Sequence, residues 1–350
     1  MKSKVPLSQK IAAAKDLQNT HVLKCPKALL GVLKVLTLVC AMVCGVYLCS
    51  TFLKQPHYQR KRDSFESKAS EMPRCINVVY KSSFTYLYYR KPESFNRLDC
   101  SRNTIRFFVI VSMQRSGSGW FESLMNSHAN VSSNGEIFGQ IHRRQNISMI
   151  INTLDSVFNL DLVTSSSKNE CSAAIGFKWM LNQGLMDHPE EILDYFIKRD
   201  VYIIFFLRRN MLSRLVSIIA NTFDKKAKLL NGVHVSHVHS QQEALTLARY
   251  KPTIDVTSLG SDLGKMESTA TKALEYYKST RHIVVYYEDL IKNFNKLIQV
   301  EDFLKLPRMK LKSRQVKIHK GPLSEYINNW DDVIKTLSGT PYERYLVGDY

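Results

Sequence analysis

From residue 105 to the C-terminus, short apolar runs alternate with segments whose apolar residues recur every three to four positions. The apolar runs are rich in β-branched and aromatic residues and predict buried strands that begin at Phe107 and lie at Ala173–Met180, Val201–Leu207 and His282–Tyr287. The recurrent spacing predicts helices that begin at Trp120 and lie at about Ile147–Leu160, Pro189–Lys198, Met211–Leu230 and Asp262–Ser279. Because strands without a polar face must be covered on both sides, the alternation predicts an α/β fold with a parallel sheet and helices on both faces.

The chain before residue 105 follows a different pattern. Residues 1–27 are polar and basic, whereas residues 28–53 are overwhelmingly apolar, and Val35–Leu53 contains no charged residue. At about 1.5 Å per helical residue, the uncharged stretch is close to the ~30 Å hydrocarbon core of a bilayer. It predicts a transmembrane signal-anchor, because a cleaved signal peptide would begin nearer the N-terminus. Basic residues flank the stretch on both sides, so the positive-inside rule does not set its orientation.

Residues 54–104 are polar and basic with weak periodicity, which is typical of a stem or linker. A short strand at Ile76–Tyr80 is expected within them. The chain therefore divides into a tail at 1–27, a membrane span at 28–53, a stem at 54–104 and one α/β domain at 105–350.

The seven cysteines form no CxxC pair, which argues against a zinc or thioredoxin-like site. Three of them, Cys75, Cys100 and Cys171, lie away from the predicted membrane span. If this part of the chain is lumenal, Cys75 and Cys100 can form a disulfide, and free thiols are the equally weighted alternative.

Length and composition indicate the size of the domain and the sign of the charge on its partner. The 350 residues are 44% hydrophobic, which suffices for one domain of about 250 residues plus appendages. The net charge of +18 indicates an anionic partner such as a nucleotide, an acidic glycan, nucleic acid or a membrane surface, although most single lysines and arginines are simply solvated. Neither an aromatic RNA-binding signature nor a zinc-finger spacing occurs, so nucleic acid is disfavoured.

The segment Gln114–Gly119 separates the first strand from the first helix with a glycine–serine loop that carries one cation, Arg115. Gly117 and Gly119 can adopt backbone angles that other residues avoid, so the loop N–H groups and the helix N-terminus can point at an anion. The loop falls at the carboxyl end of a strand, where parallel sheets bind ligands. The segment therefore predicts an anion-binding loop.

This loop differs from that of a nucleoside triphosphatase. The Walker A pattern G-x-x-x-x-G-K-[ST] is absent, and the strand at Val201–Leu207 runs into Arg208 and Arg209 rather than a metal-binding carboxylate. Holding Mg²⁺ against a triphosphate requires such a carboxylate. A loop with one arginine and several N–H and hydroxyl donors instead suits a smaller anion that is neutralised without metal.

Two further basic elements follow the loop. Arg209 ends a predicted strand and Ser217 lies about two helical turns later, so both can hold one phosphate. The basic segment Lys317–Pro322, which contains Lys320 and Gly321, can close over a nucleotide. Each element alone is as readily a surface feature, and only their combination and order are informative.

Together these elements resemble the sulfotransferase family, which has a P-loop-like fold and uses 3′-phosphoadenosine-5′-phosphosulfate (PAPS). The resemblance covers about Arg106 to the C-terminus. It implies that Arg209 and Ser217 bind the 3′-phosphate, and that the 5′-phosphosulfate is bound by Arg115-Ser116-Gly117-Ser118-Gly119-Trp120. A strand that ends in Tyr-Glu-Asp-Leu is also typical of the family, and the matching residues are Tyr287-Glu288-Asp289-Leu290.

Finer features of the sequence are similar to particular branches of this family. The segments Asn134–Glu136 and Asn329–Asp332 resemble those of the plant branch related to bacterial nodulation sulfotransferases. Arginine at position 115, in place of the lysine of the cytosolic enzymes, is typical of the carbohydrate-acting and Golgi groups.

The resemblance also implies a mechanism. An acceptor hydroxyl attacks sulfur in line, a general base takes its proton, and cations neutralise the charge on the departing oxygen. Arg115 suits the neutralising role, and related carbohydrate sulfotransferases place a glutamate at the position of Glu136; His142 is the alternative base. Lys178 interrupts an apolar strand, where a lone charge is costly unless it is used. We therefore expect Lys178 to face the site and contact sulfonate or acceptor, with an outward-pointing side chain as the alternative.

The family further implies a single-pass type II Golgi membrane protein with a lumenal domain that acts on a hydroxyl, most simply of a carbohydrate. In that compartment the sequons at Asn130 and Asn146 allow N-glycosylation, with more weight on Asn146 because Asn130 lies close to the loop. A P-loop triphosphatase or kinase, and a catalytically silent membrane protein of the same fold, are the alternative functions.

Overall fold

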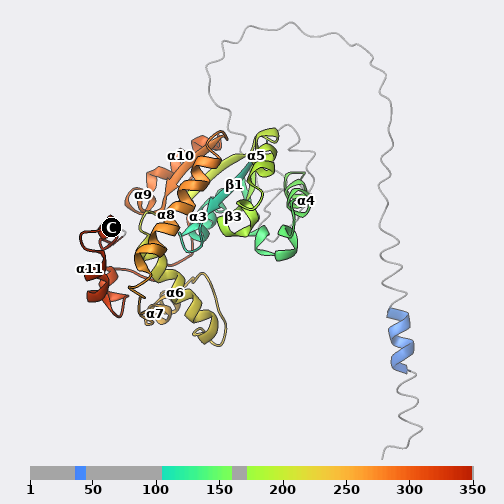
Figure 1. Cartoon of the computed structure of the whole chain (residues 1–350). Coiled ribbons are helices and arrows are strands. Elements are labelled where there is room, and N and C mark those ends of the chain that lie inside the picture. The colour runs from blue at the N-terminus through green and yellow to red at the C-terminus, as the bar shows by residue number, and fades with distance from the viewer. Residues whose placement is uncertain (1–35, 45–104, 160–171, 349–350) are drawn as a thin grey trace, which may run out of the picture. The chain divides into compact units, whose positions relative to one another are not determined.

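The computed structural model describes residues 36–44, 105–159 and 172–348 (Figure 1). The predicted tail and stem, most of the predicted membrane span, the strand expected at Ile76–Tyr80 and the cysteines at 75, 100 and 171 lie outside these residues. Residues 36–44 are helical with exposed side chains and include the free thiols of Cys40 and Cys44. Within the described ranges, no helix is long and apolar enough to cross a membrane. The signal-anchor at 28–53 stays a prediction.

In the described part of the chain, five parallel strands form one sheet in the order β2-β3-β1-β4-β5. In chain order they are β1 Arg106–Ser112, β2 Val131–Ser133, β3 Ala174–Met180, β4 Tyr202–Leu207 and β5 His282–Tyr286. The four strands expected from the apolar runs are confirmed, as is the parallel α/β architecture. The sequence pattern does not predict β2, because three residues are too few to show a periodicity.

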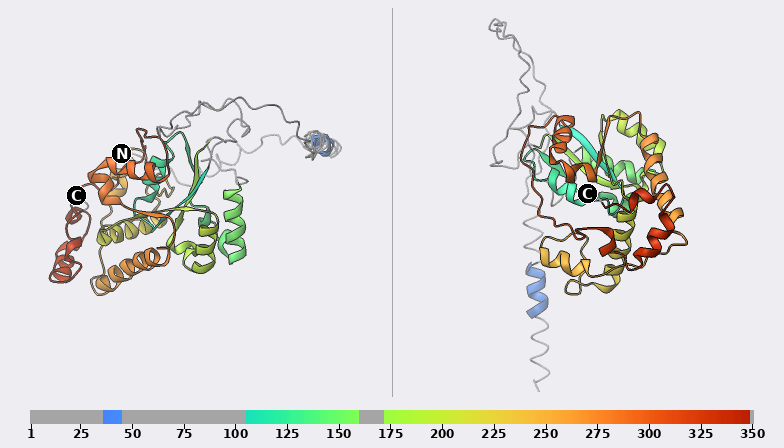
Figure 2. Two further views of the ribbon diagram at one scale, coloured as in Figure 1. Left: turned by 90° about the horizontal axis from the view of Figure 1, so that it is seen from above. Right: turned by 90° about the vertical axis from the view of Figure 1, so that its left-hand side faces the viewer.

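Alternate residues of the central strand enter separate cores on the two faces of the sheet. Phe108 and Ile110 of β1 pack on one face, and Val109 and Val111 pack on the other. The first face is covered by α3 (Ser118–Met125), α9 (Tyr287–Lys292) and α10 (Leu297–Phe303). The second is covered by α4 (Ile147–Phe158), α5 (Pro189–Lys198), α6 (Met211–Ala227), α8 (Leu259–Tyr276) and α11 (Trp330–Leu337). Figure 2 shows helices on both sides of the sheet, which explains why the strands have no polar face.

The helices predicted from apolar spacing are confirmed as α3, α4, α5, α6 and α8. Four helices of six to eight residues, α7 (Gln241–Ala248), α9, α10 and α11, were not predicted. One expectation needs correction: the segment Tyr287–Leu290 does not end a strand, because β5 stops at Tyr286 and α9 begins at Tyr287. Helical spacing lets both Tyr287 and Leu290 enter the first core.

Short helical turns connect these elements. They are η2 Ile137–Gly139, η3 Ile141–Arg144, η4 Leu181–Leu185, η5 Phe294–Lys296, η6 Leu323–Glu325 and η7 Glu343–Tyr345. After β1 the chain builds β2 and β3 on one side of that strand and then crosses to β4 and β5 on the other. Such a reversal leaves a crevice at the carboxyl ends of the strands, where β1 continues into the loop before α3. The loop predicted at Gln114–Gly119 ends at Gly117, because α3 already begins at Ser118.

Candidate active site

The loop between β1 and α3 has an unusual backbone. Arg115 and Gly117 adopt positive φ values of 63° and 84°. A Cβ atom at Gly117 would lie 2.6 Å from the Tyr287 ring, so glycine is required there. No side chain caps the N-terminus of α3, and the buried Ser116 hydroxyl has no hydrogen-bond partner among the described residues. Backbone N–H groups and a hydroxyl are therefore available to an anion.

Two arginines from distant sequence support this loop. Arg208, which follows β4, donates to the carbonyl oxygen of Arg115 (3.4 Å). The buried Arg214 of α6 donates from Nε to the carbonyl oxygen of Gln114 (2.8 Å). Burial, and then the charge of Arg208, lower the pKa of Arg214 to about 10, so it remains charged at neutral pH. The shape of the loop thus depends on the elements that follow β4.

The side chain of Arg115 turns toward α6. Its Nε donates to the Ser217 hydroxyl (2.9 Å), and its Nη1 donates to the carbonyl oxygen of Ser236 (2.9 Å). Burial, and then the charge of Arg208, lower the pKa of Arg115 to about 10. The guanidinium is therefore a fixed cation at neutral pH, held where the loop meets α6.

A cavity of about 340 Å³ opens over the loop. Its described lining includes one carboxylate, that of Glu136, and five lysine and arginine side chains: Arg115, Lys178, Arg208, Lys225 and Lys317. This excess of positive charge favours an anionic ligand. Among the residues that the structure describes, no group of three or more His, Cys, Asp and Glu side chains is placed to hold a metal ion.

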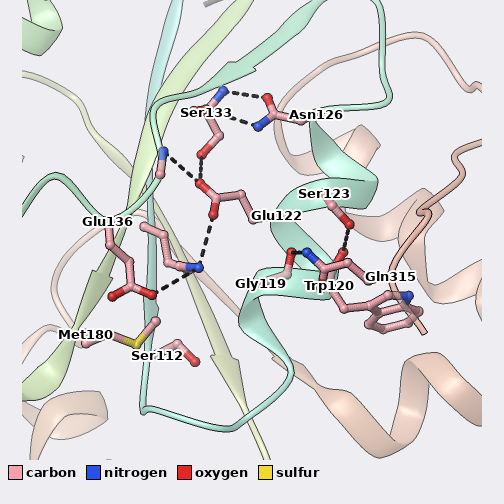
Figure 3. Close-up of polar contacts among 12 residues, drawn as sticks. Ser112, Gly119, Trp120, Glu122, Ser123, Asn126, Ser133, Glu136, Met180 and Gln315 are labelled. Atoms are coloured by element: carbon pink, nitrogen blue, oxygen red, sulfur yellow. Dashed lines mark hydrogen bonds and ion pairs between the residues drawn. The ribbon is translucent and has the colours of Figure 1, made fainter. Parts of the chain in front are cut away.

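A buried lysine lies between two carboxylates at this cavity. Lys178 of β3, with a side chain 5% exposed, pairs through Nζ with Oε1 of Glu136 (3.2 Å) and with Oε2 of Glu122 on α3 (3.1 Å). Figure 3 shows Glu122 and Glu136 approaching the same ammonium group from two sides. Gln183 donates to the second oxygen of Glu136 (3.0 Å). Glu136 is 38% exposed and lines the cavity, so it is the carboxylate that a ligand can reach.

Two histidines outside the predicted site residues also line the cavity. The His237 ring covers Gly119, because a Cβ atom at Gly119 would lie 2.2 Å from its Cε1. Burial, and then the charge of Lys178, lower the pKa of His237 to about 4. Burial, and then the charge of Arg115, lower the pKa of His319 to about 4. Both rings are neutral at neutral pH. His237 belongs to a loop without a recognisable motif, so no sequence signal marks it.

The structure brings most of the predicted site residues to one place. The cavity lining includes Arg115, Gly117, Ser118, Trp120, Glu136, Lys178, Ser217 and Gly321. Ser116 is buried within the loop, and Gly119 lies under His237. Three other predicted residues, Lys320, His142 and Arg209, lie outside this lining. Lys320 is exposed and donates to the side chain of Gln241 (2.8 Å), and His142 is exposed on η3.

Arg209 is outside the cavity lining, whereas Ser217, the residue with which it was expected to act, is part of that lining. Its guanidinium pairs with both carboxylate oxygens of Asp289 and lies 3.8 Å from the centroid of the Tyr286 ring. Arg208, by contrast, lines the cavity, whereas these contacts hold Arg209 outside its lining. A role for Arg209 in ligand binding stays a prediction.

Replacing His319 with glutamine should reduce the loss of stability at acid pH. The pKa of His319 falls from 6.5 in the unfolded chain to about 4 in the fold, so the unfolded state binds more protons between these values. Stability therefore declines as the pH falls from about 6.5 to about 4. Denaturant unfolding of both proteins across this range measures the difference, with His142→Gln as an exposed control. Equal pH slopes for parent and His319→Gln would contradict the expectation.

Known proteins provide an independent comparison. The family model described as Sulfotransferase domain matches residues 106–330. Among solved structures, a mouse sulfotransferase complexed with PAP is 15% identical, with 72% of this chain and 78% of that chain covered and a TM-score of 0.34. The sulfotransferase domain from the curacin biosynthetic pathway is 16% identical over 70% of this chain and 84% of that chain, with a TM-score of 0.34. A sulfotransferase from Alicyclobacillus acidocaldarius is 12% identical over 68% of this chain and 94% of that chain, with a TM-score of 0.35. No curated protein matches the sequence.

Proposed function

Since this chain belongs to the sulfotransferase family, whose domain model covers residues 106–330, we propose that it transfers the sulfonyl group of PAPS to a hydroxyl of a carbohydrate. The observation that carries the proposal is the anion-binding loop at Arg115–Gly117, which opens on a cavity with a strongly cationic lining. Such a cavity suits an anionic donor, because its fixed cations oppose the donor's phosphate and sulfonate charges.

The residues of the loop and cavity fit PAPS. The unpartnered Ser116 hydroxyl and the N–H groups at the start of α3 would hold its 5′-phosphosulfate. Arg208 and Lys317, which line the same cavity, offer charge to a further phosphate. Arg209 would have to leave Asp289 to join them. When bound, PAPS supplies a sulfonyl group on a phosphate leaving group.

The described side chains divide the chemical roles. Glu136, exposed to the cavity, accepts the proton of the acceptor hydroxyl as that oxygen attacks sulfur. Arg115 and Lys178 stabilise the negative charge that develops on the departing oxygen, because the Arg115 guanidinium remains cationic at neutral pH and both side chains line the cavity. Gln183 limits the rotation of the Glu136 carboxylate by donating to its second oxygen.

The carbohydrate acceptor and the Golgi location are proposed from the family resemblance. Arginine at position 115 supports a carbohydrate-type Golgi enzyme, and the segments Asn134–Glu136 and Asn329–Asp332 support the plant branch. Residues 28–53 would then be the membrane anchor and 54–104 the stem, with the catalytic domain in the lumen. In that compartment Asn146 is the better acceptor for a glycan, because Asn146 is exposed whereas Asn130 is 2% exposed. Protease protection of the full chain in sealed vesicles tests this placement.

Transfer of labelled sulfate from PAPS to a panel of cell-wall and secreted glycans tests the proposed function. We expect incorporation into at least one glycan, and metal-independent binding of adenosine 3′,5′-bisphosphate. Mg²⁺-dependent binding of ATP without binding of the bisphosphate would favour the alternative of a triphosphatase or kinase. Binding of the bisphosphate without transfer to any hydroxyl acceptor would favour the catalytically silent alternative.

Gly119→Ala should weaken binding of adenosine 3′,5′-bisphosphate roughly tenfold, about 1.4 kcal/mol. The added Cβ would overlap the His237 ring and push it toward the ligand space. Removing that ring by His237→Ala in the same protein should restore most of the affinity, because the overlap disappears. Calorimetric titration of the two variants and the parent measures the effect; a double variant no better than Gly119→Ala would refute this explanation.

A further inference from the structure

Glu122 lies outside the cavity lining, yet its carboxylate connects three parts of the site. Oε1 accepts from the Ser133 hydroxyl (2.6 Å) and from the Gly135 N–H (3.0 Å), while Oε2 pairs with the ammonium of Lys178 (3.1 Å). Figure 3 shows Glu122 extending from α3 toward the turn that follows Ser133. Its side chain is 10% exposed, so its contacts are with the protein.

Asn126, the residue that caps the C-terminus of the same helix, reinforces this connection. Its Nδ2 donates to the Ser133 carbonyl oxygen (3.0 Å), and its Oδ1 accepts from the Ser133 N–H (2.8 Å). Positions four residues apart lie on one side of a helix, so Glu122 and Asn126 face the same turn. The helix that begins at the anion-binding loop therefore holds, at two points, the turn that carries Glu136 into the cavity.

The charge of Lys178 requires a partner that stays ionised. Its ammonium is almost completely buried, and a buried cation without a counter-charge is strongly destabilising. Glu136 cannot provide a constant counter-charge, because it becomes neutral when it accepts the acceptor proton. Glu122 lies outside the cavity lining, and its Oε1 is held by hydrogen bonds from Ser133 and Gly135, so it does not meet the acceptor.

We propose that Glu122 is a positioning residue that keeps Lys178 charged and in place while Glu136 changes its protonation state. The inference rests on the proposed function, because it assigns proton transfer to Glu136. In the step itself, the bond from acceptor oxygen to sulfur forms as the bond from sulfur to phosphate oxygen breaks. The electron pair leaves on the phosphate, and the acceptor proton moves to Glu136. The pair of Lys178 and Glu122 stays electrically neutral throughout.

Glu122→Gln tests the proposal, because glutamine keeps the shape and an acceptor oxygen but removes the charge. We expect a kcat roughly tenfold lower with little change in the KM for PAPS, since among the described residues Glu136 then becomes the only carboxylate paired with Lys178 and a weaker base. The acid limb of the kcat–pH profile should move to lower pH. Besides Glu122, the groups that face Glu136 are Lys178 of β3, the neutral amide of Gln183, and His237 from the loop before α7.

Two control variants separate this role from a purely structural one. Glu301→Gln alters another buried carboxylate, on α10, which accepts from the Met309 N–H (3.0 Å) and lies outside the cavity lining. Ser133→Ala removes one hydrogen bond to Glu122 but leaves its charge. Both should keep the acid limb of the parent. A Glu122→Gln protein with lower kcat but an unmoved acid limb would overturn the proposal.

A stability measurement makes the test independent of activity. Denaturation midpoints of Glu122→Gln, Lys178→Met and the double variant should be non-additive, because removing the ammonium removes the need for its counter-charge. Additive shifts would show that Glu122 does not act through Lys178, and would overturn the proposal. If the parent binds and transfers nothing, the proposed function fails, whereas this double-mutant cycle still decides whether the two charges are coupled.

Discussion

Arg115→Ala is expected to lower sulfate transfer from PAPS by roughly 10²–10³-fold, the usual cost of removing one donor to a developing oxyanion. The substitution removes the loop's cation and releases both Ser217 and the Ser236 carbonyl. Arg115→Lys should show intermediate activity, because a lysine keeps the charge but not the fork that contacts two partners. Initial rates with labelled sulfate on the purified proteins measure these changes.

Arg281→Ala is the matched control for this experiment. Arg281 pairs with Asp200 (3.1 Å) and immediately precedes β5, at the end of the sheet away from the loop. We expect it to transfer sulfate at the parental rate. A folded Arg115→Ala protein that transfers as fast as the parent would show that the loop is not the donor site.

Glu136→Gln is expected to lower kcat by roughly 10²–10⁴-fold, the usual contribution of a general base. Glutamine is nearly isosteric but takes no proton at neutral pH. Affinity for adenosine 3′,5′-bisphosphate should stay close to that of the parent, because Glu136 is proposed to act on the acceptor rather than on the donor. Single-turnover transfer and calorimetric titration measure the two quantities separately.

His142→Gln decides between the two bases that the sequence allows. His142 is exposed on η3 and outside the cavity lining, so its substitution should leave kcat near the parental value. The opposite result, with full activity in Glu136→Gln and a large loss in His142→Gln, would assign the proton transfer to His142 instead.

The sheet and its longer helices were predictable because their signals are local and long. An apolar run such as Val201–Leu207, or a helical pattern such as Met211–Leu230, repeats its period often enough to be recognised. The three residues of β2 and the six residues of α9 are too few to repeat a recognisable period. For α9 a second signal competed, since Tyr287 extends the apolar run of β5 in the sequence.

The candidate site was predictable where its residues are neighbours in the chain. Arg115 to Trp120 are consecutive, running from the loop after β1 into the first turn of α3, and their glycines and serines suggest an anion site without any tertiary information. The direction of a side chain after the end of a strand was not predictable from the sequence. Arg208 and Arg209 are adjacent residues of the same type, so the sequence does not distinguish them. In the structure Arg208 lines the cavity, whereas Arg209 contacts Asp289 and Tyr286 outside the lining.

The order of apolar and polar residues in this chain was enough to predict a parallel α/β sheet and an anion-binding loop after its first strand, because both depend on local periodicity and backbone freedom. The tertiary structure decided which charges meet. Lys178 forms ion pairs with Glu122 of α3 and with Glu136 of the turn after β2 only when β3 and β2 pair. Arg115 meets Ser217 only when α6 packs beside the loop. Contacts between residues far apart in sequence are set by packing, and no local pattern records them.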